Sequence, residues 1–175
     1  MKRLAVLALL AVLPAVHAGG SGAAPSLCGS SPFMDIAGVR KRLMAAEALW
    51  QKRGPARYAL TTRFSGVWMR FKIEVQVADQ IVGRTTTDQL AFAGQPIPPP
   101  LVSRARPEEA QRYTVPGLFA VVHSALKSAR AAGACGVLNV HFAPHDGHVL
   151  SFQNDSSGVI DDEFLLTTSP LTLLP

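Results

Sequence analysis

The stretch MRFKIEVQV, residues 69–77, decides the fold, because apolar and polar side chains alternate along its whole length. One side of this segment carries Met69, Phe71, Ile73, Val75 and Val77, and the other carries Arg70, Lys72, Glu74 and Gln76. Such a pattern is typical of an antiparallel strand that buries one face and exposes the other. The sequence therefore predicts a sheet with one covered face and one polar, solvated face.

Other strand patterns flank this segment on both sides. They are found at residues 58–64, 81–87, 137–143, 149–154 and about 163–168. Alternation, β-branched residues and turn signals such as Ser65-Gly66 support these assignments. The chain is therefore expected to hold two groups of three strands.

Two amphipathic helices are predicted before these two groups. The first begins at Asp35, which can cap it, and ends at Gly54. The second is capped by Thr114, has Pro116 in its first turn and ends at Gly133. Their apolar stripes recur at steps of three and four residues: Ile36, Val39, Leu43, Ala46 and Trp50, then Val115, Leu118, Phe119, Val122, Leu126 and Ala129.

The order of these elements, α-βββ-α-βββ, predicts an α+β fold for residues 33–175 as a single domain. We expect one antiparallel sheet of about six strands with two helices on one face. Residues 88–113 show no sustained hydrophobic period, so they are predicted to form a long loop. This loop holds Pro96, Pro98, Pro99, Pro100 and Pro107.

The N-terminus has the features of a secretory signal peptide. Lys2 and Arg3 precede an apolar run that ends in small residues, so residues 1–18 are predicted to be cleaved after Ala18. The run is too short for a transmembrane helix, and no membrane span is expected after cleavage. Residues 19–32 are predicted to form a flexible leader, and the mature protein is expected in the periplasm or secreted.

The two cysteines and the net charge indicate which covalent links and which partners can be expected. Cys28 and Cys135 would enter an oxidising compartment, where they could form a disulfide; the alternative for Cys28 is a lipid anchor. The formal charge of +5 falls to +3 without Lys2 and Arg3. The basic run at 40–42 is interpreted as the solvated face of a helix, and no nucleic-acid partner is expected.

The strands predicted at residues 137–143 and 149–154 form the second hairpin. A cluster of histidines in this hairpin is the most specific sign of chemical function in the sequence. His141, His145, Asp146 and His148 lie within eight residues, and such side chains hold zinc when they converge. Whether these side chains converge depends on the register in which the two strands pair. Pairing Phe142 with Leu150 and Val140 with Phe152 leaves a three-residue loop, His145-Asp146-Gly147, with Gly147 in the left-handed conformation. His141 then points to solvent beside Ser151, and His148 points to the opposite face, so no metal site is predicted.

The leading functional hypothesis is a non-enzymatic binding or interaction domain of the bacterial envelope. Its partner would be an envelope protein or a small ligand, with no cofactor; the oligomeric state stays open. The sheet's exposed face is one candidate surface, and the others are Trp68, Pro98, Pro99, Pro100, His145, Asp146 and His148. The alternative is a metal-binding or hydrolytic enzyme that uses His141, His145 and Asp146.

Several short motifs, taken in order, resemble a family of small exported bacterial proteins. They are Trp50 with Tyr58, Thr114-Val115 with Leu118-Phe119, Pro144-x-x-Gly147, and Asp161-Asp162-Glu163. Some members are lipid-anchored, and their shared domain has no known function. The resemblance, from about Ala45 to Thr168, implies export and this order of elements but no activity, cofactor or catalytic residue. The chain departs from the family hairpin Asp-Pro-x-x-Gly-Tyr-Pro at Ala143, His148 and Val149.

Overall fold

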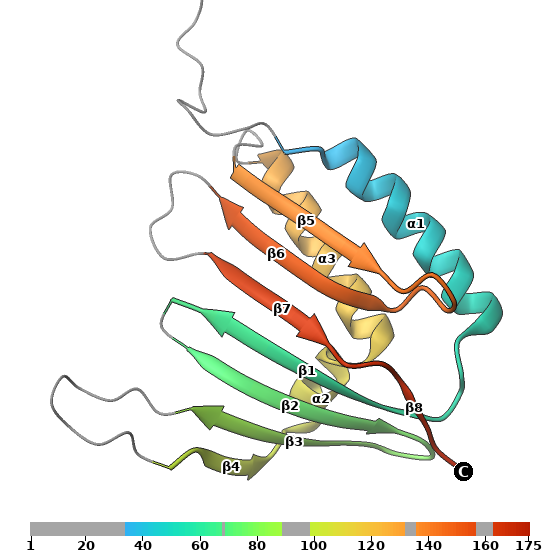
Figure 1. Ribbon diagram of the computed structural model, residues 1–175, viewed down its shortest axis with the longest axis vertical. Helices are drawn as coiled ribbons and strands as arrows, with labels where there is room; N and C mark the ends of the chain where they lie inside the picture. The colour runs from blue at the N-terminus through green and yellow to red at the C-terminus, as the bar shows by residue number, and fades with distance from the viewer. Residues whose placement is uncertain (1–33, 68, 89–98, 132–135, 157–162) are drawn as a thin grey trace, which may run out of the picture.

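The computed structural model describes residues 34–67, 69–88, 99–131, 136–156 and 163–175. Three helices and eight strands follow one another along these ranges (Figure 1). They are α1 (Ile36–Arg53), β1 (Tyr58–Gly66), β2 (Arg70–Val77), β3 (Ile81–Asp88), β4 (Leu101–Arg104), α2 (Pro107–Arg112), α3 (Val115–Ala131), β5 (Gly136–Phe142), β6 (Val149–Ser156), β7 (Phe164–Thr168) and β8 (Thr172–Leu173). The predicted α+β class is confirmed.

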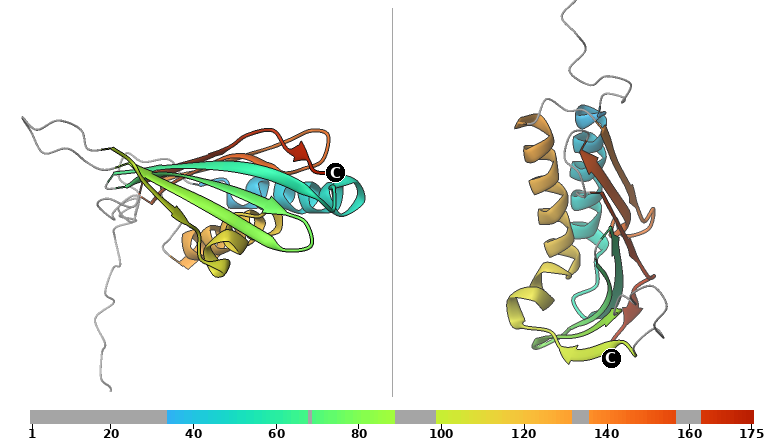
Figure 2. Two further views of the ribbon diagram at one scale, coloured as in Figure 1. Left: turned by 90° about the horizontal axis from the view of Figure 1, so that it is seen from below. Right: turned by 90° about the vertical axis from the view of Figure 1, so that its left-hand side faces the viewer.

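The strands form one antiparallel sheet in the order β4-β3-β2-β1-β7-β6-β5, and β8 pairs with β1. The helices lie together on one face of this sheet, and the other face is left uncovered by the described elements (Figure 2). Strand β7 comes late in the chain but inserts beside β1, joining the early and late groups of strands. This arrangement leaves β4 and β5 at the two edges.

The alternating segment behaves as predicted in its interior. Ile73 and Val75 of β2 are buried, and Leu60 of β1, which pairs with Val75, is also buried. The prediction was wrong for Met69, which is 50% exposed because the strand begins one residue later. The core therefore lies between this side of the sheet and the helices.

The capping residues predicted from the sequence begin both long helices. The Asp35 carboxylate accepts a hydrogen bond from the Gly38 N–H at 2.8 Å, and α1 ends at Gly54. Thr114 Oγ1 accepts a bond from the Gly117 N–H at 3.1 Å at the start of α3. The predicted stripe of α3 is buried along its whole length: Val115, Leu118, Phe119, Val122, Leu126 and Ala129.

The prediction of one long loop at residues 88–113 was wrong for its second half. Residues 101–104 pair with β3 as strand β4, and residues 107–112 form helix α2. Pro107 stands at the first position of this helix and two glutamates follow in its first turn, which are favourable signals for a helix start. The strand lacks a local pattern and forms because β3 offers it a free edge.

Tyr58 links the sheet to both long helices. Its ring meets that of Trp50 of α1 edge-on, with centroids 5.4 Å apart. Its hydroxyl group accepts a hydrogen bond of 3.0 Å from the Val115 N–H, in the first turn of α3. Burial raises the pKa of the Tyr58 phenol, so its stabilising neutral form persists in the folded state above its ordinary titration range.

We predict that Tyr58→Phe lowers the free energy of unfolding by about 1–3 kcal/mol, because it leaves the buried Val115 N–H without an acceptor. Urea denaturation measures this change. Tyr113→Phe is the matched control, since the Tyr113 hydroxyl makes no hydrogen bond to another described residue, and it should cost less. Equal losses for the two variants would contradict the role given to Tyr58.

Candidate functional site

The second hairpin differs from its predicted register. Val140 pairs with Phe152 and His141 with Ser151, as expected, but Phe142 pairs with Val149 rather than Leu150. A bulge between His141 and Phe142 causes the shift, because an extra residue on one strand moves the following pairs by one position. The predicted three-residue loop was therefore also wrong. Gly147 adopts a positive φ of 83°, which confirms that part of the prediction.

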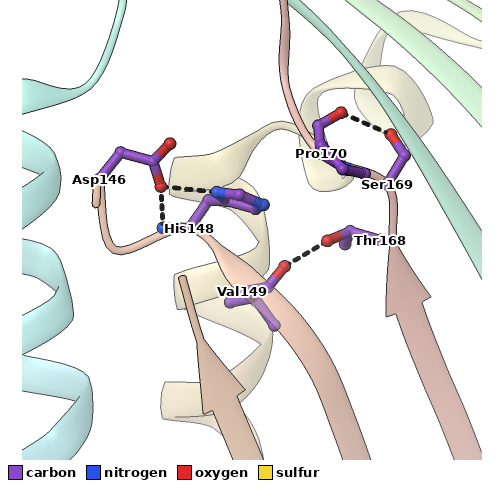
Figure 3. Close-up of polar contacts among 6 residues, drawn as sticks. All are labelled: Asp146, His148, Val149, Thr168, Ser169 and Pro170. Atoms are coloured by element: carbon purple, nitrogen blue, oxygen red, sulfur yellow. Dashed lines mark hydrogen bonds and ion pairs between the residues drawn. The ribbon is translucent and has the colours of Figure 1, made fainter. Parts of the chain in front are cut away.

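Asp146 and His148 form a structural pair at the base of this loop (Figure 3). One carboxylate oxygen of Asp146 accepts hydrogen bonds from the His148 backbone N–H at 3.0 Å and from Nδ1 at 2.6 Å. A carboxylate only accepts hydrogen bonds, so Nδ1 carries the proton. His148 is 4% exposed and its Nε2 atom has no partner among the described residues. His148 is therefore buried, whereas the prediction placed it on an exposed interaction surface.

The remaining candidate ligands of the hairpin do not converge. His141 lies exposed on the uncovered face of the sheet, His145 is exposed in the loop, and Asp146 is engaged by His148. Among the described residues, no group of three His, Cys, Asp or Glu side chains is placed to hold a metal ion. The three residues His141, His145 and Asp146 are therefore not brought together as metal ligands, and the hydrolytic alternative stays a prediction.

Other predicted positions stand apart from this hairpin. Pro99 and Pro100 are exposed just before the β4 edge strand. The remaining positions lie outside the described residues: the cleavage site at Ala18, Cys28 and Cys135, Trp68, and Pro98. The proposed disulfide and the lipid anchor thus stay predictions.

The uncovered face of the sheet carries a cluster of charges in strands β1–β4. Their seven charged residues all lie on this face, because they alternate along their strands with residues of the buried side and pair with one another across neighbouring strands. Five are cations and two are carboxylates: Arg63, Arg70, Lys72, Arg84 and Arg104, with Glu74 and Asp88. We call these seven residues the basic face. Alternation predicted its polarity, but only the register shows its excess of positive charge.

A shallow hollow of about 410 Å³ lies within the basic face. Arg63, Lys72 and Glu74 line it, together with hydroxyl groups of Thr61, Thr167, Thr168 and Ser169. Lys72 Nζ donates to Glu74 Oε1 at 2.8 Å, and this hydrogen bond is the main reason that the pKa of Glu74 lies below its ordinary value. Arg63 makes no ion pair with a described carboxylate. The hollow therefore presents the Arg63 guanidinium, which has no carboxylate partner among the described residues, beside the hydroxyl groups of Thr61 and Thr167, whereas those of Thr168 and Ser169 already donate to backbone carbonyls.

A larger hollow of about 760 Å³ lies on the helical side, between α3 and the sheet. Phe152 and Phe164 form part of its floor, and their rings meet edge-on at 5.3 Å. The described residues that line this hollow do not indicate a particular ligand.

Comparison with known proteins places the chain in a family. The family of unknown function DUF6174 matches residues 42–173, which include every described helix and strand from the middle of α1 onward. The chain belongs to this family. Membership of DUF6174 confirms the prediction from the sequence motifs that the chain carries a family domain of unknown function. No curated protein and no solved structure matches the chain. Within the described residues of this DUF6174 member, no helix has the length and apolar character needed to cross a membrane.

We predict that Asp146→Ala destabilises the protein by about 1–3 kcal/mol, because it removes both hydrogen bonds to His148 and leaves buried donors unpaired. His145→Ala, one residue earlier and exposed, is the matched control and should change stability by less than about 0.5 kcal/mol. Thermal unfolding of both variants makes the comparison. If the two substitutions cost the same, the Asp146–His148 pair does not hold the loop.

We also predict that Gly147→Ala destabilises the protein by more than about 1 kcal/mol, since a side chain is strained at positive φ. An added Cβ would also meet the backbone of Ala46 in α1. Chemical denaturation measures the loss, with Pro144→Ala in the exposed part of the same loop as control. An unchanged midpoint for Gly147→Ala would contradict this close approach.

Proposed function

We propose that this protein is an exported binding domain of the bacterial envelope that recognises a phosphate-bearing polymer through its basic face. The N-terminal signal pattern supports export, and the uncovered sheet supplies a surface on which an extended polymer can lie. The partner is defined by its chemistry, a chain with repeated negative charges. The proposal needs no cofactor and no chemical step.

The observation that carries this proposal is the pairing of like charges across neighbouring strands. Arg63 stands opposite Lys72, and Arg84 stands opposite Arg104. Like charges directly opposite one another destabilise a sheet, so these pairs work against folding stability. An anionic partner would relieve this repulsion on binding. Glu74 stands opposite Arg84 and bonds to Lys72, so one carboxylate offsets part of this repulsion, but the face keeps an excess of cations.

The geometry of the basic face suits repeated oxyanions. Adjacent strands lie about 4.8 Å apart, and alternate residues along one strand lie about 6.8 Å apart. Arg63 can bind an oxyanion through two parallel N–H groups, and hydroxyl groups of Thr61 and Thr167 lie in the same hollow. Cations at these spacings can contact successive phosphates of one extended chain.

A binding experiment tests this function with long-chain polyphosphate as the probe. We expect the double variant Arg63→Gln with Lys72→Gln to raise the dissociation constant about tenfold or more at low salt. The slope of log affinity against log salt should fall by about 1–2, one for each phosphate contact that is lost. Fluorescence titration at several salt concentrations measures both quantities.

The matched control removes the same two charges from another surface. Arg40 and Lys41 are exposed on α1, in the helical layer, so Arg40→Gln with Lys41→Gln should leave both quantities nearly unchanged. Equal weakening by the two double variants would mean that only net charge matters, and the proposed face would be wrong. Failure of the unmodified protein to bind polyphosphate would also overturn it.

A further inference from the structure

We infer that the free edge of β5 and the adjoining side of α1 form a peptide-binding groove that takes an extended acidic segment of another protein as an added strand. This site lies at the opposite end of the sheet from β4 and does not use the basic face. It goes beyond the proposed function and stands on separate observations.

The groove has a volume of about 620 Å³ and two distinct walls. One wall is the continuous run from Asn139 to Pro144, which belongs to β5 and the turn after it. Side chains of neighbouring strand residues point to opposite faces, so consecutive residues can line one groove only where it follows the edge of the backbone. The hollow therefore runs along the open side of β5.

The other wall is a single stripe of α1. Arg42, Ala45, Ala46 and Leu49 line it, and their spacing of three and four residues places them on one side of the helix. The small alanine side chains keep the helix wall low, which leaves room for side chains of an added strand. Leu49 and Phe142 supply partly exposed apolar surface at the same groove.

Among the described residues, the backbone of β5 has no hydrogen-bond partner on this side. Strand β5 ends the sheet order, and residues 136–142 make no backbone hydrogen bond beyond their pairing with β6 among the described residues. Such an edge is a template for another strand unless it is short, charged, broken by proline, twisted by a bulge or covered by a helix or loop. The bulge in this hairpin lies only at the end of β5, between His141 and Phe142, and α1 lies beside the strand without a hydrogen bond to its backbone among the described residues. Edge strand β4 is short and follows Pro99 and Pro100, whereas β5 spans seven residues without proline or lysine.

Charge complementarity specifies the occupant. Among the described residues that line the groove, Arg42 and His141 are the ionisable ones, and none carries a carboxylate. Arg42 is 3.7 Å from Asp35 in a solvent-exposed ion pair, which contributes little and can be exchanged for another carboxylate. An extended peptide with apolar residues toward α1 and an acidic residue near Arg42 fits these walls. Strand addition supplies backbone hydrogen bonds, and the groove selects the side chains.

A second copy of this chain fits the same edge less well. Helix α1 lies beside β5 and extends past the edge of the sheet (Figure 1). Two copies that joined their β5 edges would bring two α1 helices, each with Arg42 and the neighbouring run of cations, to one junction. A single strand meets only one helix, so it avoids this repulsion.

A phage-displayed library of random peptides is the probe for this groove. Selection on the protein is expected to enrich peptides with alternating apolar residues and at least one acidic residue. A selected peptide should bind at least about tenfold more weakly to Ala45→Trp, which fills the groove, and to Arg42→Glu, which reverses its charge. Hydrogen exchange should show new protection of β5 amides when the peptide is bound.

Two substitutions on the same helix serve as matched controls. Ala48 and Arg40 are exposed on α1 and do not line the groove, so Ala48→Trp and Arg40→Glu should leave peptide affinity unchanged. Circular dichroism checks that each variant is folded, and Arg42→Glu keeps the test valid if Ala45→Trp unfolds. The double variant Arg63→Gln with Lys72→Gln should still bind the peptide, which separates this site from the basic face.

Three results would overturn the inference. The first is a selection that enriches no peptide on the unmodified protein over Ala45→Trp. The second is a selected peptide that protects strands other than β5 or binds equally to the groove variants and their controls. The third is a dimer in solution that Ala45→Trp dissociates, because the edge would then serve a second copy.

Discussion

Burial of the sheet on one side only is the constraint on which the rest of this structure depends. Leu60, Ile73 and Val75 are at most 2% exposed because the helices cover them. Side chains alternate along a strand, so charged residues in β1–β4 have only the uncovered face available. The hydrophobic effect that builds the core thus also gathers the charges of these strands into one surface.

The same constraint leaves two open surfaces of different chemistry. The basic face presents side chains, whose attraction to anions acts over distance and weakens with salt. The β5 edge presents backbone N–H and C=O groups, whose hydrogen bonds are directional and accept only an extended chain. Helix α1 contributes to both the core and this edge: Val39, Leu43 and Ala46 are buried, while Arg42, Ala45 and Leu49 reach the groove.

Prediction succeeded at the caps of the two long helices, where the signal was local, but it missed α2 although Pro107 and two glutamates mark the start of that helix. Asp35 and Thr114 cap their helices through hydrogen bonds to residues three positions away, so their neighbours in sequence were enough to find them. Strand β4 has no such pattern, and it forms only because β3 lies beside it. The candidate surfaces were also only partly predictable. The polar side of β2 was evident from the sequence. That Arg63 of β1 and Arg84 of β3 lie opposite this side is decided by the register between the strands, which the sequence pattern of one strand does not give.

By itself, the sequence determined the α+β class, the two long helices with their caps, six of the strands and the polarity of the open sheet face, because these follow from side-chain patterns over a few residues. Only the tertiary structure decided that β7 inserts beside β1, that a bulge shifts Phe142, and that His148 is buried against Asp146. The physical reason is that pairing and burial are contacts between distant segments. Their free energies depend on the whole assembly and leave no periodic signal along the chain.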